Sequence, residues 1–233
     1  MRILLIVMTL AVIAAPHARS ADSLSPAAVQ AAASQSAPAV PVHASALTIV
    51  ALGDSLTSGH RLPRDEAYPA RLQAALEGSG LPFLVVNHGV NGDTSAGGVR
   101  RLDAALAEQP RILIVAFGAN DGLRGVPVAQ VRRNLERIIE TAQARGIAVL
   151  LVGMEALPIY GWQYTIDFHN LFPELAAKYQ VPLVPFMLNG VLGNPDLMSP
   201  DGVHPNARGA EIIAANIWTE LQPLAQSLVA GTR

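Results

Sequence analysis

The sequence contains no cysteine among its 233 residues. This absence excludes a disulfide scaffold, a thiolate nucleophile, cysteine-ligated zinc and iron–sulfur clusters. Any covalent chemistry must therefore use oxygen or nitrogen.

An excess of either charge is also missing, because 16 basic residues stand against 18 acidic ones and give a net charge of −2. Proteins that bind a polyanion usually carry an excess of basic residues, and this balance shows none, so a nucleic-acid partner is not expected. The hydrophobic content of 51% is ample for a core and excludes disorder over the whole chain. A small or neutral substrate fits this composition.

Long apolar runs are absent except near the start, where residues 3–15 are apolar apart from Thr9. The run follows Arg2 and precedes small residues such as Ala18 and Ser20. It is shorter than the roughly 20 residues of a membrane span. We therefore predict a signal peptide over residues 1–20 and an exported protein, periplasmic or secreted, with an uncleaved anchor as the alternative.

Residues 21–46 are rich in Ala, Ser, Pro and Gln. They carry too few large apolar side chains to offset the entropy of ordering them, so we predict a flexible linker. A short Ala-rich helix over residues 26–34 is the alternative. The folded domain is then expected over residues 47–233.

Within that domain, β-prone apolar runs alternate with helical patterns. The predicted strands are 47–52, 83–87, 112–117, 147–152 and 181–185. The predicted helices are 67–76, 99–107, 128–144, 170–178 and 206–221. This alternation predicts an α/β fold with one parallel sheet of about five strands and helices on both faces.

Ligands of such sheets bind beyond the carboxyl ends of the strands, so the residues that follow each strand carry most weight. Four segments stand out: Gly53-Asp54-Ser55-Leu56, Gly92-Asp93-Thr94, Gly118-Ala119-Asn120-Asp121 and Asp201-Gly202-Val203-His204-Pro205. They supply a hydroxyl, unshielded backbone amides, a side-chain amide and a carboxylate–imidazole pair.

These groups meet the needs of acyl transfer to water. A serine must give its proton to a base, a third group must hold that base, and donors must meet the developing oxyanion. Ser55 at a strand-to-helix turn can be the nucleophile, and His204 with Asp201 on one tight loop can be the base and its orienting carboxylate. The amides of Ser55 and Gly92 and the side chain of Asn120 can serve as donors.

The four segments, in this order and spacing, resemble the signature blocks of the GDSL, or SGNH, hydrolases. The similarity runs from about Leu47 to Leu221 and is greatest to secreted bacterial arylesterases and the acyl-CoA thioesterase I/lysophospholipase L1 group. It implies a flavodoxin-like three-layer α/β/α sandwich without a metal or organic cofactor. It also implies Ser55, His204 and Asp201 as catalytic residues, and Ser55, Gly92 and Asn120 as the oxyanion hole.

Several polar residues near these blocks have open roles. Ser58-Gly59-His60-Arg61 departs from the Ala-Gly-Tyr-Gly more usual in the family, and both His60 and His88 can contact a substrate or serve as plain rim histidines. We expect Asp54 to cap a helix rather than to move protons. Asp93 and Asp121 are expected to be braces, and His169 a structural residue of a loop that also holds Asp167.

A pocket wall is predicted in the segment 157–168, which carries four aromatic residues. Tyr160, Trp162, Tyr164 and Phe168 are therefore candidates for an apolar acyl or aryl pocket, with a core position as the alternative.

The sequence thus predicts a serine esterase for short to medium acyl or aryl esters, extending to thioesters and lysophospholipids. A carbohydrate O-acetyl esterase is the alternative enzyme, and a catalytically silent binding module is the alternative of another class. The expected partner is a small ester, with at most transient membrane or lipid contact. The pattern gives no indication of the oligomeric state.

Overall fold

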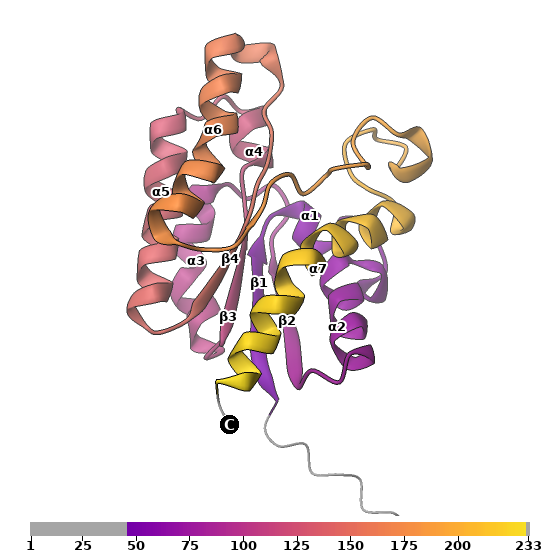
Figure 1. The fold of residues 1–233 in the computed structure, drawn as a ribbon. Helices are drawn as coiled ribbons and strands as arrows, with labels where there is room; N and C mark the ends of the chain where they lie inside the picture. Colours follow the sequence, from indigo (N-terminus) through magenta and orange to yellow (C-terminus); the bar gives the residue numbers. More distant parts are fainter. Residues whose placement is uncertain (1–45, 232–233) are drawn as a thin grey trace, which may run out of the picture. The chain divides into compact units, whose positions relative to one another are not determined.

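In the part of the chain that the structure describes, five parallel strands form one sheet in the order β2-β1-β3-β4-β5 (Figure 1). The computed structural model describes residues 46–231, so the predicted signal peptide and nearly all of the predicted linker lie outside the described residues. The strands are β1 (Leu47–Gly53), β2 (Phe83–Gly89), β3 (Ile112–Ala116), β4 (Ala148–Val152) and β5 (Leu183–Val184). This strand order is that of flavodoxin, and the predicted fold class is confirmed.

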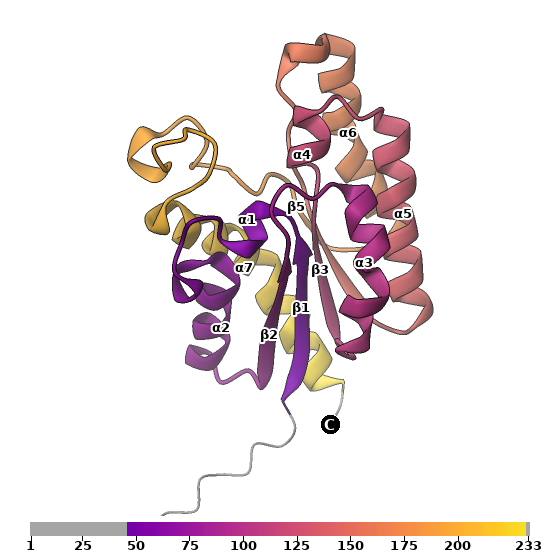
Figure 2. The same ribbon diagram turned by 180° about the vertical axis from the view of Figure 1, so that it is seen from behind.

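Helices cover both faces of the sheet. The α-helices are α1 (Ser55–Ser58), α2 (Tyr68–Gly78), α3 (Ser95–Ala107), α4 (Ala119–Leu123), α5 (Val128–Ala144), α6 (Trp162–Tyr179) and α7 (Ala207–Ala230). The short 3₁₀ helices of residues 46–231 are η1 (Arg64–Glu66), η2 (Pro158–Tyr160) and η3 (Pro195–Leu197). Helices α2 and α7 pack together on one face, and α3, α5 and α6 lie on the other (Figures 1 and 2).

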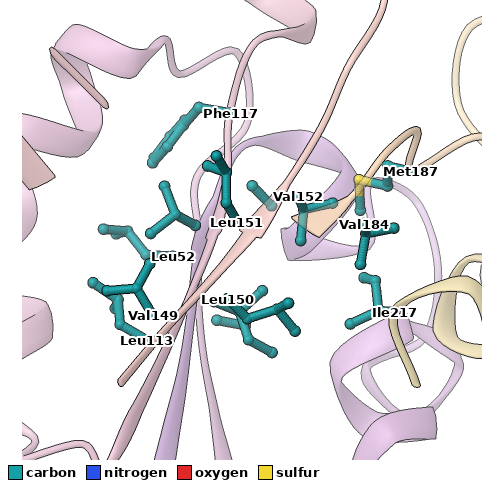
Figure 3. Close-up of a cluster of buried hydrophobic side chains, with 14 of the residues drawn as sticks. Leu52, Leu113, Phe117, Val149, Leu150, Leu151, Val152, Val184, Met187 and Ile217 are labelled. Carbon is teal, nitrogen blue, oxygen red and sulfur yellow. The ribbon is translucent and has the colours of Figure 1, made fainter. Parts of the chain in front are cut away.

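The core lies where the sheet meets these helices. Strand β3 is buried along its whole length, as expected for a central strand of a parallel sheet. Leu150 and Val184 of the sheet cluster with Met187 and with Ile217 of α7, as Figure 3 shows. On the opposite face, the apolar stripe of α5 is buried, with Val131, Leu135, Ile138, Ile139 and Ala142.

Two predicted helices are longer in the structure. Helix α6 begins at Trp162 rather than at residue 170, because Phe168, Leu171, Phe172 and Leu175 bury one continuous stripe. His169 therefore lies on a helix, and the prediction of a loop at this position is wrong. Helix α7 continues beyond residue 221 through Pro223 to Ala230, and its buried stripe extends to Ala225.

Chain order places the candidate residues at one edge of the sheet. The chain leaves β1 for β2 on one side and returns to β3 on the other, so the segments after β1 and β3 diverge at the carboxyl ends of the strands. Such a reversal of strand order is where open α/β sheets bind ligands. Among the helices of residues 46–231, none has the length and apolar character needed to cross a bilayer.

Candidate active site

Ser55 is the first residue of α1, directly after β1, and it is only 9% exposed. The preceding Asp54 caps this helix, because its carboxylate accepts a hydrogen bond from the Leu56 amide at 3.0 Å. As the first residue of the helix, Ser55 has an amide that finds no partner within the helix. Helix α1 also lies tight against β2, where a Cβ on Gly89 would be 2.1 Å from the Ser58 nitrogen.

His204 and Asp201 lie on a loop that is held at both ends. The Ser199 amide donates to the His204 carbonyl at 2.7 Å, and the Asn206 amide donates to Leu197 at 2.9 Å. Asn206 then caps α7 through its side chain, which accepts from the Gly209 amide at 3.0 Å. These bonds fix the loop before the helix begins, so its side chains are positioned by backbone contacts.

The three predicted catalytic residues lie in one hydrogen-bonded row. Nε2 of His204 lies 3.0 Å from the Oγ of Ser55, and Nδ1 of His204 lies 2.9 Å from Oδ2 of Asp201. The other carboxylate oxygen of Asp201 accepts from the amides of His204 and Val203. These bonds hold the pKa of Asp201 well below its usual range, the His204 amide having the largest effect.

Asn120 lies on α4, directly after β3, and borders the same cavity as Ser55 and His204. Its Nδ2 lies 3.4 Å from Oδ2 of the buried Asp54, which links the segments after β1 and β3. Burial raises the pKa of Asp54 from 3.8 to about 7, although the Leu56 amide and the Asn120 side chain act in the opposite direction. Asp54 is thus both a helix cap and a partner of Asn120.

Helix α4 is held in place by hydrogen bonds between its buried residue Asp121 and Ser95 of α3. Both carboxylate oxygens of Asp121 accept hydrogen bonds from Ser95, from its hydroxyl at 2.6 Å and its amide at 2.9 Å. Asn134 of α5 completes the network by donating to the Ser95 hydroxyl. Asp121 is fully buried and does not line the cavity, so the expected brace is found here.

Gly92 lies in the segment after β2 with φ at +73°, a conformation that side chains rarely adopt. Its carbonyl accepts from Arg124 at 2.8 Å. The next residue, Asp93, accepts from Arg101 at 2.8 Å, and Arg101 also donates to the carbonyls of His88 and Gly53. Asp93 therefore braces the ends of β1 and β2 through an arginine, as the sequence predicts.

An apolar cavity of about 300 Å³ opens beside Ser55. Its apolar lining comes from four regions of the chain: Leu56 of α1, Ala119 and Leu123 of α4, Met154, Ala156 and Leu157 after β4, and Phe186, Leu188, Leu192 and Val203 beyond β5. Glu155 is the charged residue in this lining, and its carboxylate lies 2.8 Å from Nδ1 of His169. The position of residues 154–157 at the carboxyl end of β4 is the signal in the sequence that could have identified them.

None of the four predicted aromatic residues is among those that line this cavity, although Leu157, the first residue of the predicted segment, does line it. Phe168 is fully buried, and Trp162 is 73% exposed. The Tyr164 hydroxyl donates to the Val126 carbonyl at 2.9 Å, and the Tyr160 hydroxyl donates to Leu123 at 3.1 Å. Both tyrosine hydroxyls thus bind backbone carbonyls in α4 or just after it, so these side chains brace α4 and do not line the cavity.

His88 and His60 occupy two different settings. His88 lies 3.4 Å from Glu108 and is not among the residues that border Ser55. His60 instead packs on the catalytic candidate, with its ring centroid 4.3 Å from that of His204. The end of α1 holds His60 in this position. Gly59 ends the helix in a left-handed turn, and the His60 amide donates a hydrogen bond to the Ser55 carbonyl.

Comparison with known proteins agrees with this architecture. The model of the GDSL-like lipase/acylhydrolase family matches residues 51–212. The chain belongs to this family, and its class of activity is carboxylic ester hydrolysis.

Two curated relatives are similar over most of their length. Esterase TesA of Pseudomonas aeruginosa is 40% identical over 182 residues, which cover 78% of this chain and 90% of the relative. Thioesterase 1/protease 1/lysophospholipase L1 of Escherichia coli K12 is 38% identical, over 78% of this chain and 86% of the relative. The crystal structure of TesA superposes with a TM-score of 0.73 at 39% identity, covering 76% of this chain and 99% of that structure.

Proposed function

We propose that this chain is a serine esterase for short- to medium-chain acyl or aryl esters, with Ser55 as its nucleophile. The observation that carries the proposal is the hydrogen-bonded row of Ser55, His204 and Asp201 beside an apolar cavity. The volume of about 300 Å³ is at the lower end of the range for ligand pockets, which favours acyl groups of modest length.

In the first half of the reaction, Ser55 Oγ forms a bond to the ester carbonyl carbon as its proton passes to Nε2 of His204. The tetrahedral intermediate collapses when His204 returns that proton to the leaving alkoxide, which leaves an acyl-enzyme on Ser55. A thiolate leaving group would accept the same proton, which extends the proposal to thioesters.

In the second half, water gives a proton to His204 and attacks the acyl carbon, and Ser55 leaves with its proton restored. Asp201 stays ionised throughout, because its hydrogen bonds depress its pKa. It accepts from Nδ1 of His204 and stabilises the imidazolium that forms in each half-reaction.

The oxyanion of both intermediates needs preorganised donors. We assign this role to the amides of Ser55 and Gly92 and to Nδ2 of Asn120, which come from the segments after β1, β2 and β3. Asp54 accepts a hydrogen bond from Nδ2 of Asn120 and so would orient its amide.

Transient lipid contact forms part of the proposal. Leu123, Leu157, Leu192 and Val203 line the cavity and are each about half exposed. Trp162, at the start of α6, is exposed by 73% and is of the amphipathic kind that favours lipid–water boundaries. This exposed apolar rim supports brief contact with micelles of lysophospholipid substrates. We also propose that the protein is exported by the predicted signal peptide at residues 1–20.

Turnover of p-nitrophenyl esters from acetate to palmitate, measured beside acetylated xylan and a lysophospholipid, tests the substrate class. We expect the highest kcat/KM for short and medium acyl esters and little turnover of acetylated xylan. Acetyl-only activity with strong release of acetate from xylan would assign the carbohydrate O-acetyl esterase instead. Absence of turnover on every ester would assign the binding module.

A further inference from the structure

A second imidazole lies directly beside the proposed catalytic pair. The His60 and His204 rings are separated by 4.3 Å between centroids, with 42° between their planes. Both histidines border the narrow recess that also contains Ser55 and Tyr68.

Asp201 adds a carboxylate to the two imidazoles. His60, His204 and Asp201 each offer one ligand atom, and these three atoms lie within 4.8 Å of one another. Two imidazole nitrogens and one carboxylate oxygen form a donor set that suits Zn²⁺, at ligand distances of about 2.0–2.2 Å. Binding of one ion would need side-chain movements that bring the three atoms to these distances.

We propose that His60, His204 and Asp201 bind a zinc ion that reversibly inhibits the enzyme. The proposal rests on the proposed role of His204 as the general base. Three protein ligands leave a fourth tetrahedral position for water. The ion is an inhibitor in this account and takes no part in ester hydrolysis.

Inhibition follows from the hydrogen bonds that His204 already makes. Its Nε2 is in contact with Ser55 and its Nδ1 with Asp201, so zinc must displace one of these contacts to reach a ring nitrogen. Displacement at Nε2 removes the acceptor of the Ser55 proton. Coordination at Nδ1 places the ring proton on Nε2, which then cannot accept the proton of Ser55.

Electrostatics favour the ion over an uncharged ligand. Asp201 brings the acidic side chain of the cluster. The two imidazoles add no charge when they are neutral, so zinc would find one net negative charge at the site. The side chains of His204 and Asp201 are 19% and 26% exposed, which leaves the group accessible from solvent.

The direct test is calorimetric titration of zinc chloride into the full chain carrying Ser55→Ala, which retains all three proposed ligands. The same titration is made with His60→Tyr and His60→Gln added in turn. His88→Tyr is the matched control, because His88 also faces a carboxylate but does not border Ser55. Even an outer-shell partner contributes about 10- to 100-fold to metal affinity, so both His60 variants should bind zinc at least about tenfold more weakly. His88→Tyr should bind as the parent does.

Inhibition of the catalytically intact chain is then measured, each variant being compared with its own zinc-free rate. We expect the half-inhibiting zinc concentration to rise by the same factor in the His60 variants, and EDTA to restore activity. Equal zinc affinity with and without His60, or inhibition that His60→Tyr leaves unchanged, would overturn the site. Because calorimetry needs no turnover, failure of the proposed serine mechanism would be seen separately, as ester hydrolysis that survives Ser55→Ala.

Discussion

The buried carboxyl of Asp54 lies 3.4 Å from the side-chain nitrogen of Asn120. Asp54 directly follows β1, and Asn120 lies in α4 after β3. Their contact therefore joins the two segments that diverge from the middle of the sheet. The same carboxyl caps the helix of Ser55. A single side chain thus aligns the proposed nucleophile with the proposed oxyanion donor.

Asn120→Ala should lower kcat by about 10²- to 10³-fold, because a preorganised donor to the oxyanion would be lost. Steady-state hydrolysis of p-nitrophenyl acetate measures the effect. The control is Asn170→Ala, an exposed position on α6, which should retain the parent rate. A loss of less than about fivefold at Asn120 would remove this side chain from the oxyanion hole.

Asp54→Asn should flatten the dependence of stability on pH. The folded chain keeps the Asp54 proton up to about pH 7, whereas the unfolded chain loses it near 3.8. The unfolded state therefore binds fewer protons within this window, and the free energy of unfolding falls as pH rises through it. The variant caps the helix without titrating, so it should lose less stability between pH 3.8 and about 7.

Urea unfolding across that window, followed by circular dichroism, measures the difference between the two chains. The lowered pKa of Asp201 acts in the opposite direction, since its contribution is lost as pH falls, but it is common to both chains and cancels. Asp103→Asn, at an exposed side chain paired with Arg145, should follow the parent curve. Parallel curves for Asp54→Asn and the parent would contradict the raised pKa.

Leu157→Trp should shift the substrate preference toward shorter acyl chains. Leu157 lines the cavity, and the larger ring would fill part of it. Since one methylene in an apolar pocket is worth about 1–3 kcal/mol, the ratio of kcat/KM for decanoate over acetate should fall by about tenfold or more. Ile159→Trp is the matched control, because Ile159 is 62% exposed and is not among the lining residues. An unchanged ratio in Leu157→Trp would show that the acyl chain binds elsewhere.

Phe168→Ala should destabilise the fold by about 3–5 kcal/mol, the usual cost of removing a buried aromatic ring. Trp162→Ala, on the same helix but 73% exposed, should change the free energy of unfolding by less than about 0.5 kcal/mol. Chemical denaturation of both variants at one pH measures their free energies of unfolding against that of the parent. Similar costs for the two variants would contradict the assignment of Phe168 to the core.

The sheet and the catalytic candidates could be predicted because both depend on local pattern and chain order. Buried parallel strands are short apolar runs, and the residues after them must meet at one edge. The segments of Ser55, Asn120 and His204 are all found at that edge. Helix α5 has a clean apolar stripe, and its predicted range, Val128–Ala144, is the range observed.

The cavity wall could not be predicted in the same way, because it depends on tertiary packing. Tyr164 and Phe168 have the spacing of a buried helical stripe and also the chemistry of an aryl pocket, and only the packing of α6 against α4 distinguishes the two roles. The contact of His60 with His204 joins positions 144 apart in sequence, and no local pattern encodes it.

Covalent labelling identifies the nucleophile of this chain. A fluorophosphonate probe is incubated with the purified chain, and the modified peptide is identified by mass spectrometry. We expect one adduct, on Ser55. The Ser55→Ala variant should carry no adduct and should lose about 10⁶-fold in kcat. Ser227→Ala, an exposed position near the end of α7, should be labelled and active as the parent is. An adduct on another residue, or ester hydrolysis that Ser55→Ala leaves unchanged, would show that Ser55 is not the nucleophile.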